Sequence, residues 1–539
     1  MVAGERNGIE ADYIVIGGGS AGAVLAARLS ENPDVRVLLL EAGGEAKSLL
    51  IALPVGYAKL VTDAKVDWNY EQKPDASING RAWIWSGGRV LGGGSSINGQ
   101  VFIRGTRDDF DRWERLGATG WGFDAVLPYF LRSEDWQGAP SQAHGQQGPL
   151  TVAPIRDPHP LSRLFLEACR ERGIPTLDDY NDGSSFGAFL TQTNQRGGWR
   201  CSTEKAFLRP ARQRPNLTVL TGAEVERIII ENHRAVGVEF TRRGVRQSAK
   251  ARREVIASAG AIGTPALLMR SGIGPADHLR DHGIAVVHDL PEVGANLQEH
   301  PAAGVSRRVS VPTLNTQIGA LDMVGHLARF ILRKMGPLTS PAVQAMGLAK
   351  TLPDLDQPDI QLHFSPVAGT IGPDTMSPAK AEMADEAAIT LYASLCQPKS
   401  RGRIVLGERG RPVVDHQLIG HPDDVAALVR AMRLVSAILD SDAFAPIMKG
   451  PRNPAATPSD DAGWTEFVRA NTVITWHPVG TCRMGSDAAS VVDPELRVRG
   501  IAALRVVDAS VMPTISSGNT NAPTIMIAER AAELIAGRP

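Results

Sequence analysis

The sequence predicts an α/β fold in which a Rossmann-like dinucleotide-binding domain carries an inserted substrate domain with a largely antiparallel sheet. Three observations lead to this prediction. An apolar strand, a glycine-rich turn and a helix open the chain, and a second unit of the same kind follows near residue 260. Between residues 301 and 460 the apolar runs are short, prolines are frequent and no glycine fingerprint occurs. Short strands without intervening helices favour antiparallel pairing.

The first unit has the pattern of a nucleotide-binding βαβ motif. The apolar residues 13–16 predict a buried strand, and the helical spacing of residues 21–29 predicts the helix that follows. The glycines between them stand at the spacing that a bound pyrophosphate requires, in Gly17-x-Gly19-x-x-Gly22. The first permits a tight turn, the second a close approach of the phosphates, and the third close packing of helix and strand.

The next strand adds an acidic residue to this motif. Residues 35–40 form a second apolar run, which ends at Glu41. A carboxylate at this position is typical of a contact with the adenine-side ribose of a dinucleotide. A βαβ turn without a ligand is the alternative interpretation, and the motif by itself leaves NAD and FAD open.

The rest of the chain shows further elements of the two predicted domains. Residues 85–105 are rich in glycine and predict an extended loop, and residues 216–240 predict a β-hairpin. Residues 254–274 predict a strand, a turn and a helix. Near the C-terminus we expect a strand that ends at Asp508 and an amphipathic helix that begins at about Thr524. The predicted dinucleotide-binding domain comprises residues 1–155, 201–305 and 471–539, and the predicted substrate domain comprises residues 156–200 and 306–470.

Composition excludes several classes of function. The 57 Lys and Arg residues balance 58 Asp and Glu residues, so no global field favours nucleic acid. The four cysteines show no CxxC spacing and predict free thiols in a reducing compartment. No apolar stretch approaches the roughly twenty residues that span a bilayer, and the N-terminus lacks an apolar signal core, so we expect a cytoplasmic enzyme. His278 and His282 have no third ligand at a recognisable spacing, and we therefore predict no metal site.

Five motifs, in order along the chain, carry a resemblance to a known family. They are GGRVLGGGSSINGQVFIRG (87–105), SAGAIGTPALLMRSGIGP (258–275), NLQEHP (296–301), HPVGTCRMG (477–485) and GNTNAPTIMIAE (518–529). Together they resemble the signatures of the glucose–methanol–choline (GMC) oxidoreductase family, over nearly the whole chain. The resemblance implies FAD as the cofactor and an alcohol as the small-molecule substrate.

The resemblance also implies where the cofactor lies. Asn98 and Gly99 would lie beside the middle of the flavin, Val225 would contact the adenine, and Asp508 would close over the ring end. Some relatives attach the flavin through a histidine at the position of Ile97, whose alkyl side chain forms no such bond. We therefore expect non-covalent FAD. The predicted cofactor-binding residues are Gly17, Gly19, Ser20, Ala21, Gly22, Glu41, Ala42, Trp68, Arg89, Gly94, Asn98, Gly99, Val225, Trp476, Asp508, Asn519 and Thr520.

The chemistry of alcohol oxidation points to a histidine. The reaction removes a hydride from carbon and a proton from the hydroxyl, and the proton needs a base with a pKa near working pH. His477, in TWHPVGTC, lies in a family-like active-site motif and is the predicted base. Asn519 matches the second member of the catalytic pair and would donate a hydrogen bond to the alkoxide oxygen. Cys482 and His300 are interpreted as packing and bracing residues.

The resemblance implies that Trp476, the residue before His477, lines the substrate pocket. Its broad apolar face and its N–H donor suit aromatic or medium-length apolar primary alcohols. A cation–π contact keeps a choline-type dehydrogenase as an alternative. A lyase-type member or a non-catalytic flavoprotein is the alternative of another class. The electron acceptor, oxygen or a quinone-like molecule or dye, stays open, because a threonine at position 475 does not block access to the flavin. The particular alcohol and the oligomeric state are not indicated.

Overall fold

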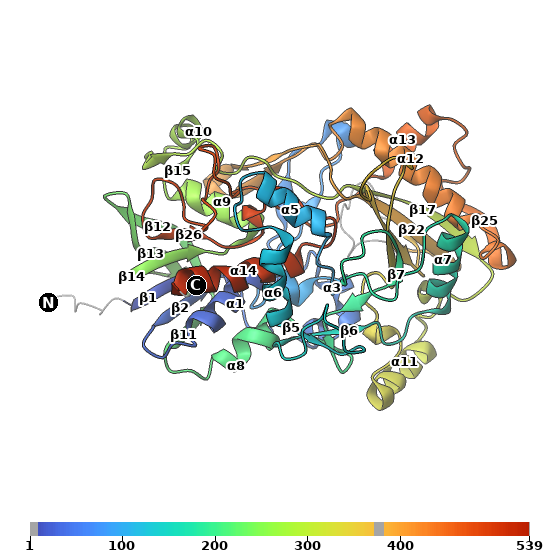
Figure 1. The fold of residues 1–539 in the computed structure, drawn as a ribbon, viewed down its shortest axis with the longest axis horizontal. Coiled ribbons are helices and arrows are strands. Elements are labelled where there is room, and N and C mark those ends of the chain that lie inside the picture. Colours follow the sequence, from blue (N-terminus) through green and yellow to red (C-terminus); the bar gives the residue numbers. More distant parts are fainter. Residues whose placement is uncertain (1–8, 371–381, 538–539) are drawn as a thin grey trace.

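The computed structural model of the protein describes residues 9–370 and 382–537. Figure 1 shows two sheet regions at opposite ends of the molecule. Strands β1, β2 and β14 (Ile9–Ile16, Val37–Glu41 and Val245–Ala257) lie at one end, and β17 and β22 (Ala302–Val309 and Ala388–Leu395) lie at the other.

The first sheet has seven strands and a parallel centre. β1 lies between β2 and β14, and it runs parallel to both. β11 (Leu217–Thr221) extends this parallel part beyond β2, and β26 (Leu504–Val506) pairs in parallel with the end of β14. Early, middle and late parts of the chain thus share one sheet, which confirms the predicted α/β fold.

The prediction for residues 216–240 is only partly correct. β12 (Ala223–Glu231) and β13 (Arg234–Arg242) form the expected hairpin, and its two turn residues, Asn232 and His233, adopt left-handed φ values of 49° and 56°. Residues 217–221 form β11 instead, because their apolar side chains pair beside the buried strand β2. The alternation of apolar and polar residues does not by itself show that Gly222 separates β11 from β12, or that these two strands pair with different partners.

Helices cover both faces of the first sheet. α1 (Ser20–Leu29) packs beside α14 (Asn521–Ala536), and α6 (Phe123–Ser133) packs on α14. α9 (Gly260–Arg270) contacts β12. The remaining α-helices are α2 (Leu49–Ala52), α3 (Tyr57–Leu60), α4 (Gly94–Ile97), α5 (Arg107–Arg115), α7 (Pro160–Glu171), α8 (Arg209–Ala211), α10 (Ala276–Asp281), α11 (Ala320–Arg333), α12 (Pro422–Leu439) and α13 (Asp461–Asn471).

The second sheet is antiparallel throughout. Its six strands follow the order β25–β17–β22–β19–β18–β7, and every neighbouring pair is antiparallel. α12 packs across β17 and β22. This sheet confirms the largely antiparallel substrate side, whereas the exact domain boundaries stay a prediction. Besides β17 and β22, the strands of this sheet are β25 (Met448–Asn453), β19 (Ile360–Ser365), β18 (Ala345–Ala349) and β7 (Gly187–Leu190).

A smaller four-stranded sheet joins segments that lie far apart in the sequence. β3 (Tyr70–Gln72) pairs with β4 (Ile84–Trp85) and, in parallel, with β24 (Pro412–Asp415), which pairs with β23 (Arg403–Leu406). The sequence pattern did not indicate this pairing, because residues 403–415 belong to the predicted substrate domain. It brings residues 407–413 to the cofactor side.

Three local features differ from the predictions. The loop at 85–105 contains one helical turn, α4, and β26 ends two residues before Asp508. Asp508 instead accepts a hydrogen bond from Ser510 N and caps a 3₁₀ turn. α14 begins at Asn521, earlier than expected, and its first backbone hydrogen bond runs from Thr524 N to the carbonyl oxygen of Thr520 at 3.1 Å. Within residues 9–370 and 382–537, every helix is too short or too polar to span a lipid bilayer.

Candidate active site

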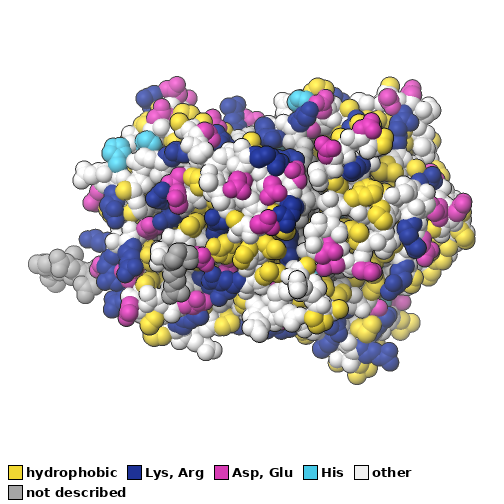
Figure 2. Space-filling view, viewed as in Figure 1, with side chains coloured by type: hydrophobic (Ala, Val, Ile, Leu, Met, Phe, Trp, Pro, Cys, Tyr) yellow, Lys and Arg dark blue, Asp and Glu magenta, His cyan; other side chains and the backbone are white. Residues whose placement is uncertain are grey.

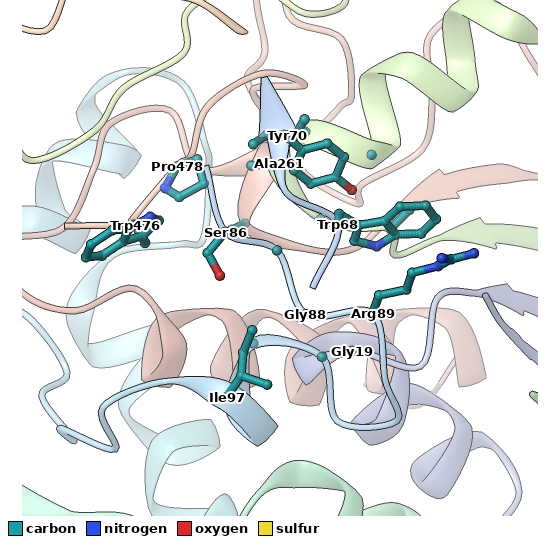
Figure 3. A pocket seen from close by; sticks show the side chains of 18 of the residues that line it. Gly19, Trp68, Tyr70, Ser86, Gly88, Arg89, Ile97, Ala261, Trp476 and Pro478 are labelled. Atoms are coloured by element: carbon teal, nitrogen blue, oxygen red, sulfur yellow. The ribbon is translucent and has the colours of Figure 1, made fainter. Parts of the chain in front are cut away.

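A single large cavity runs from the first sheet to the second. Its volume is about 1550 Å³, and it is lined by Gly17 and Glu41 on one side and by His363 and Tyr392 on the other. Figure 3 shows Trp68 and Arg89 at one end, Trp476 and Pro478 at the other, and Ile97 between them. This volume exceeds that of an ordinary small-molecule pocket and suits a dinucleotide together with a substrate.

The cavity is lined by nearly all the residues that were predicted to bind the cofactor or to act in catalysis. All the predicted cofactor-binding residues except Gly22 line it, and so does His477. Gly22 lies behind the wall: a Cβ atom on it would stand 1.9 Å from the carbonyl oxygen of Gly17. This geometry shows the close packing of α1 on the turn after β1 that the motif predicts.

Three glycine-rich turns, at residues 17–19, 92–94 and 258–260, lie close together in the wall of the cavity. Gly17 has a φ of +96°, and a Cβ there would stand 2.5 Å from the carbonyl oxygen of Ser258. Gly93 has a φ of +50°, and a Cβ there would stand 2.6 Å from the Cα of Gly19. The N-terminus of α1, with Ser20, opens into the cavity beside them. Bare backbone and free helical N–H groups fit a diphosphate.

Glu41 supports the first of these turns directly. Its carboxylate accepts hydrogen bonds from Gly18 N and Gly43 N, both at 2.7 Å. Burial raises the pKa of Glu41. Each carboxylate oxygen has a further lone pair, so the side chain still fits a ribose hydroxyl. Glu41 therefore combines the predicted position with a structural role that the sequence did not indicate.

Aromatic and cationic groups form the end of the cavity near β3. The guanidinium group of Arg89 lies 4.7 Å from the centre of the Trp68 ring, and the rings of Trp68 and Tyr70 stack with their centres 5.9 Å apart. Arg270 and residues 407–413 also line this end. Sequence reasoning missed Tyr70, Arg270 and this loop, because no local motif marks them.

A buried arginine positions the chain at Asn98. The Nη1 atom of Arg200 donates to the backbone oxygen of Asn98 at 2.7 Å and to its Oδ1 at 2.9 Å. Burial lowers the pKa of Arg200 to about 9. Sequence reasoning missed Arg200 as well. Ile97, beside it in sequence, presents its alkyl side chain to the cavity, as Figure 3 shows.

The predicted catalytic pair meets at the opposite end. The Nε2 atom of His477 lies 2.9 Å from the Nδ2 atom of Asn519, although 42 positions separate the residues in the sequence. Asn519 Nδ2 is a donor only, so Nε2 is the acceptor and carries a lone pair. Burial, and next the neighbouring His300 and His363, lower the pKa of His477 well below its usual value. The imidazole is therefore neutral at pH 7.

Three residues behind His477 hold the imidazole in place. Its Nδ1 atom lies 2.9 Å from Thr475 Oγ1 and 3.1 Å from His300 Nδ1. Glu299 is fully buried, and its carboxylate accepts from the backbone N–H groups of His300, Thr475 and His477 and from the Thr475 hydroxyl. Burial raises the pKa of Glu299 to about 8. Glu299 and His300 thus brace the loop, and the motif NLQEHP carries both.

Trp476 lines the cavity next to Pro478 (Figure 3), in a left-handed conformation with a φ of 59°. Such a φ is uncommon for a bulky residue and is typical of functional loops. Its Nε1 atom donates to the carbonyl oxygen of Ile84 at 3.2 Å. The expected N–H donor is thus already engaged, so Trp476 offers a substrate its apolar face alone.

The second sheet completes the cavity with residues that the sequence did not mark. His363 on β19 and Tyr392 on β22 line it, together with Ala302 at the start of β17. His363 is buried, and its Nε2 atom lies 3.0 Å from Ser394 Oγ. Short strands carry no readable motif, so only their pairing shows which side chains face the cavity.

The cysteines and the histidine pair are structural. Cys169, Cys201, Cys396 and Cys482 are buried and form no disulfide in the structure. His278 Nε2 accepts from Leu406 N at 3.0 Å. In the described part of the chain, no cluster of three or more His, Cys, Asp or Glu side chains has the arrangement of a metal site.

Comparison with known proteins agrees with this architecture. Residues 11–302 and 398–528 match the N- and C-terminal models of the GMC oxidoreductases. The chain is 40% identical to an alcohol dehydrogenase [acceptor] of Pseudomonas putida, over 97% of this chain and 95% of that protein. It is 37% identical to an oxygen-dependent choline dehydrogenase of Brucella suis biovar 1, over 98% and 96% of the two chains.

Solved structures share the fold along the whole length. Pyridoxine 4-oxidase from Mesorbium loti superimposes with a TM-score of 0.88 at 31% identity, over 98% of this chain and 100% of that one. Formate oxidase of Aspergillus oryzae has a TM-score of 0.89 at 26% identity and a coverage of 98% of each chain. The motifs, the cavity and these matches agree: the chain belongs to the GMC oxidoreductase family, and FAD is its cofactor.

Proposed function

We propose that this protein oxidises a primary alcohol, with aromatic or apolar alcohols favoured, to the aldehyde, and that His477 is the general base. The observation that carries the proposal is the 2.9 Å contact between His477 Nε2 and Asn519 Nδ2 at one end of a cavity that fits FAD. The relatives named as alcohol dehydrogenase and pyridoxine 4-oxidase support the reaction class.

The residues of the chain divide the work as follows. Bound FAD would supply the acceptor for the hydride that leaves the substrate carbon. The neutral Nε2 atom of His477 takes the hydroxyl proton, and the Nδ2 group of Asn519 donates a hydrogen bond to the substrate oxygen as negative charge develops there. The apolar face of Trp476 orients the substrate and excludes water.

A choline-type activity is the second candidate. The choline dehydrogenase relative and the aromatic rings of Trp476 and Tyr392 in the cavity wall favour it, because such rings attract a quaternary ammonium. The buried carboxylate nearest the catalytic pair, Glu299, already accepts four hydrogen bonds and is not among the residues that line the cavity. This arrangement favours a neutral apolar alcohol over choline.

The proposal extends to the electron acceptor and to the cellular location of the protein. We infer that the electron acceptor is either oxygen or a quinone-like molecule, and hydrogen peroxide formed in proportion to substrate would identify an oxidase. Turnover with an artificial dye but without peroxide would identify a dehydrogenase. Four buried thiols without disulfides support a cytoplasmic location.

An anaerobic alcohol panel tests the proposal. The purified holoprotein is mixed with an aromatic alcohol, a medium-chain aliphatic alcohol, a secondary alcohol and choline, and the loss of flavin absorbance is followed. We expect the fastest reduction with the aromatic or aliphatic primary alcohol. Reduction by choline alone would establish the second candidate, and reduction by no alcohol in the panel would contradict both. Heat denaturation should release free FAD, since Ile97 offers no attachment atom.

A further inference from the structure

One helix of the substrate side exposes its apolar face. α11 (Ala320–Arg333) packs chiefly on the short 3₁₀ turn η5 (Pro337–Thr339). In Figure 1 it stands out from the body of the molecule at the lower right. Among its residues only Phe330 is buried, and the large apolar residues that it and its N-terminal flank expose are Ile318, Leu321, Met323, Val324, Leu327, Ile331 and Leu332.

The apolar residues share one side of the helix. At 100° per residue, Val324, Leu327 and Ile331 fall on one stripe, and Leu321 lies at its edge. Their exposed fractions range from 51% for Leu327 to 89% for Leu321. Exposed apolar side chains are ordinary when scattered, but a stripe about 15 Å long, from Leu321 to Ile331 on one helix, marks an interaction surface.

The opposite side attaches α11 to the protein. The ring of Phe330 contacts Trp199 edge to face, with the ring centres 4.7 Å apart. Arg329 forms an ion pair with Asp157 at 2.8 Å, and His326 Nε2 lies 3.0 Å from the backbone oxygen of Gln317. The helix is therefore held in one orientation, with the apolar stripe directed away from the body.

Positive charge gathers at the C-terminal end of α11. Arg333 and Lys334 end the helix, and Arg333 forms no ion pair with any residue of the described ranges. The ammonium group of Lys334 lies 4.8 Å from the centre of the Phe330 ring, at the base of the helix. Asp322 is the acidic residue of the helix. Figure 2 shows dark-blue basic and yellow hydrophobic side chains together in the region of α11.

A second exposed apolar element lies nearby. Leu49 and Leu50 of α2 are 64% and 43% exposed. α2 packs on the 3₁₀ turn η1 (Pro54–Gly56), and η1 contacts η5, on which α11 rests. The chain after η1 and the chain after η5 supply Tyr57 and Val343 to the wall of the cofactor cavity.

We propose that α11, together with Leu49 and Leu50, holds this protein on the surface of an anionic phospholipid membrane. An amphipathic helix with an apolar stripe and a basic end lies in the plane of the interface, where burial of the stripe and attraction of the positive charge to anionic lipid both add to its affinity. A projecting convex helix enters a lipid surface without a complementary groove, and the positive charge of Arg333 and Lys334 at its C-terminal end matches anionic headgroups. If the proposed function holds, apolar alcohols dissolved in the membrane reach the cavity from this side.

Vesicle flotation of the full-length holoprotein tests the proposal. We expect the protein to float with vesicles of phosphatidylcholine and phosphatidylglycerol, to float less with phosphatidylcholine alone, and to be released by high salt. The variant Leu321→Ser/Val324→Ser/Ile331→Ser should lose vesicle affinity by at least about tenfold. A tenfold change corresponds to about 1.4 kcal/mol, and the transfer of these three apolar side chains from water into lipid contributes more than that. Arg333→Gln should weaken binding to the anionic vesicles only.

A control variant uses apolar residues exposed elsewhere. Leu116→Ser/Val245→Ser, at positions 48% and 46% exposed, should float like the unmodified protein. Flotation of the α11 variant at the level of the unmodified protein would overturn the proposal. So would an unmodified dimer that the α11 variant dissociates, since a second copy would then cover the stripe. Flavin reduction by a water-soluble alcohol should be equal in all variants, so this test fails or succeeds independently of the proposed function.

Discussion

The hydroxyl oxygen of Thr475 lies 2.9 Å from Nδ1 of His477, and this contact sets the tautomer of the imidazole. The other two partners of the hydroxyl, Glu299 Oε1 at 2.8 Å and the His300 carbonyl at 3.1 Å, are acceptors and take its proton. With the Glu299 carboxylate ionised, Thr475 Oγ1 then accepts from His477 Nδ1–H. The lone pair of the ring then lies on Nε2, which faces Asn519 in the cavity.

Replacing Thr475 by valine should slow flavin reduction by about tenfold, since the variant loses one hydrogen bond that favours the productive tautomer. Anaerobic stopped-flow measurements with an aromatic alcohol give the rate. We expect kcat to fall while KM changes little, and Thr475→Ser, which keeps the hydroxyl, to restore the rate. An equal loss in the serine and valine variants would show that Thr475 acts through packing.

His477→Ala should retain FAD and slow flavin reduction by about 10²–10⁴-fold, the usual contribution of a general base. Asn519→Ala should slow it less, because one neutral donor to a developing alkoxide contributes about 2–4 kcal/mol at most. His282→Ala, at an exposed position on the surface, is the matched control and should react normally. Reduction of the His477 variant at the normal speed would place the base elsewhere.

The pH dependence of flavin reduction follows from the burial of His477. Burial lowers the pKa of His477 well below 6.5, and the base must be unprotonated to act. The rate should therefore be level from neutral to alkaline pH and fall only in acid, well below pH 6.5. His363→Asn removes a neighbouring basic group that lowers this pKa, so the acid limb should move to higher pH. An acid limb at pH 6.5 or above in the unmodified enzyme would contradict the burial argument.

Trp476→Ala should widen the substrate range to bulkier and secondary alcohols. The loss of an apolar ring face should raise KM for the best apolar alcohol by about tenfold. This corresponds to the loss of about 1.4 kcal/mol of binding free energy from apolar burial. Steady-state kinetics across the alcohol panel measure both effects. Trp68→Ala, at the other end of the cavity, serves as the control and should reduce FAD retention with an unchanged substrate profile. If the Trp476 variant had the original profile, the residue would not line the substrate site.

Glu41→Ala should weaken FAD retention more than it slows chemistry. It removes the acceptor of Gly18 N and Gly43 N, so each N–H loses a partner at a cost of about 1–3 kcal/mol. Flavin content after gel filtration and thermal unfolding of the apoprotein measure the two consequences. Glu41→Gln keeps the size of the side chain and one acceptor oxygen, and we expect an intermediate loss. Full flavin content in the alanine variant would mean that other groups hold the ribose.

The local parts of this protein were readable from its sequence. The motif Gly17-x-Gly19-x-x-Gly22 predicted a strand, a turn and a helix, and the structure contains β1 and α1 at these positions. The same holds for the strand that ends at Glu41. Backbone conformation at a tight turn and the periodicity of apolar residues depend on neighbours in the sequence, so a linear pattern is sufficient to indicate them.

The catalytic end of the cavity required the tertiary structure. Sequence motifs predicted His477 and Asn519 as the catalytic pair. Only the three-dimensional structure shows that Thr475 contacts the imidazole and that Glu299 binds Thr475 and the backbone of His477. It also shows that the Trp476 N–H donates to Ile84. The tautomer of a histidine and the free donors of a tryptophan depend on which polar groups the fold brings within 3 Å. Long-range pairing, such as that of β3 with β24, decides this, and no local pattern encodes which distant strand completes a sheet.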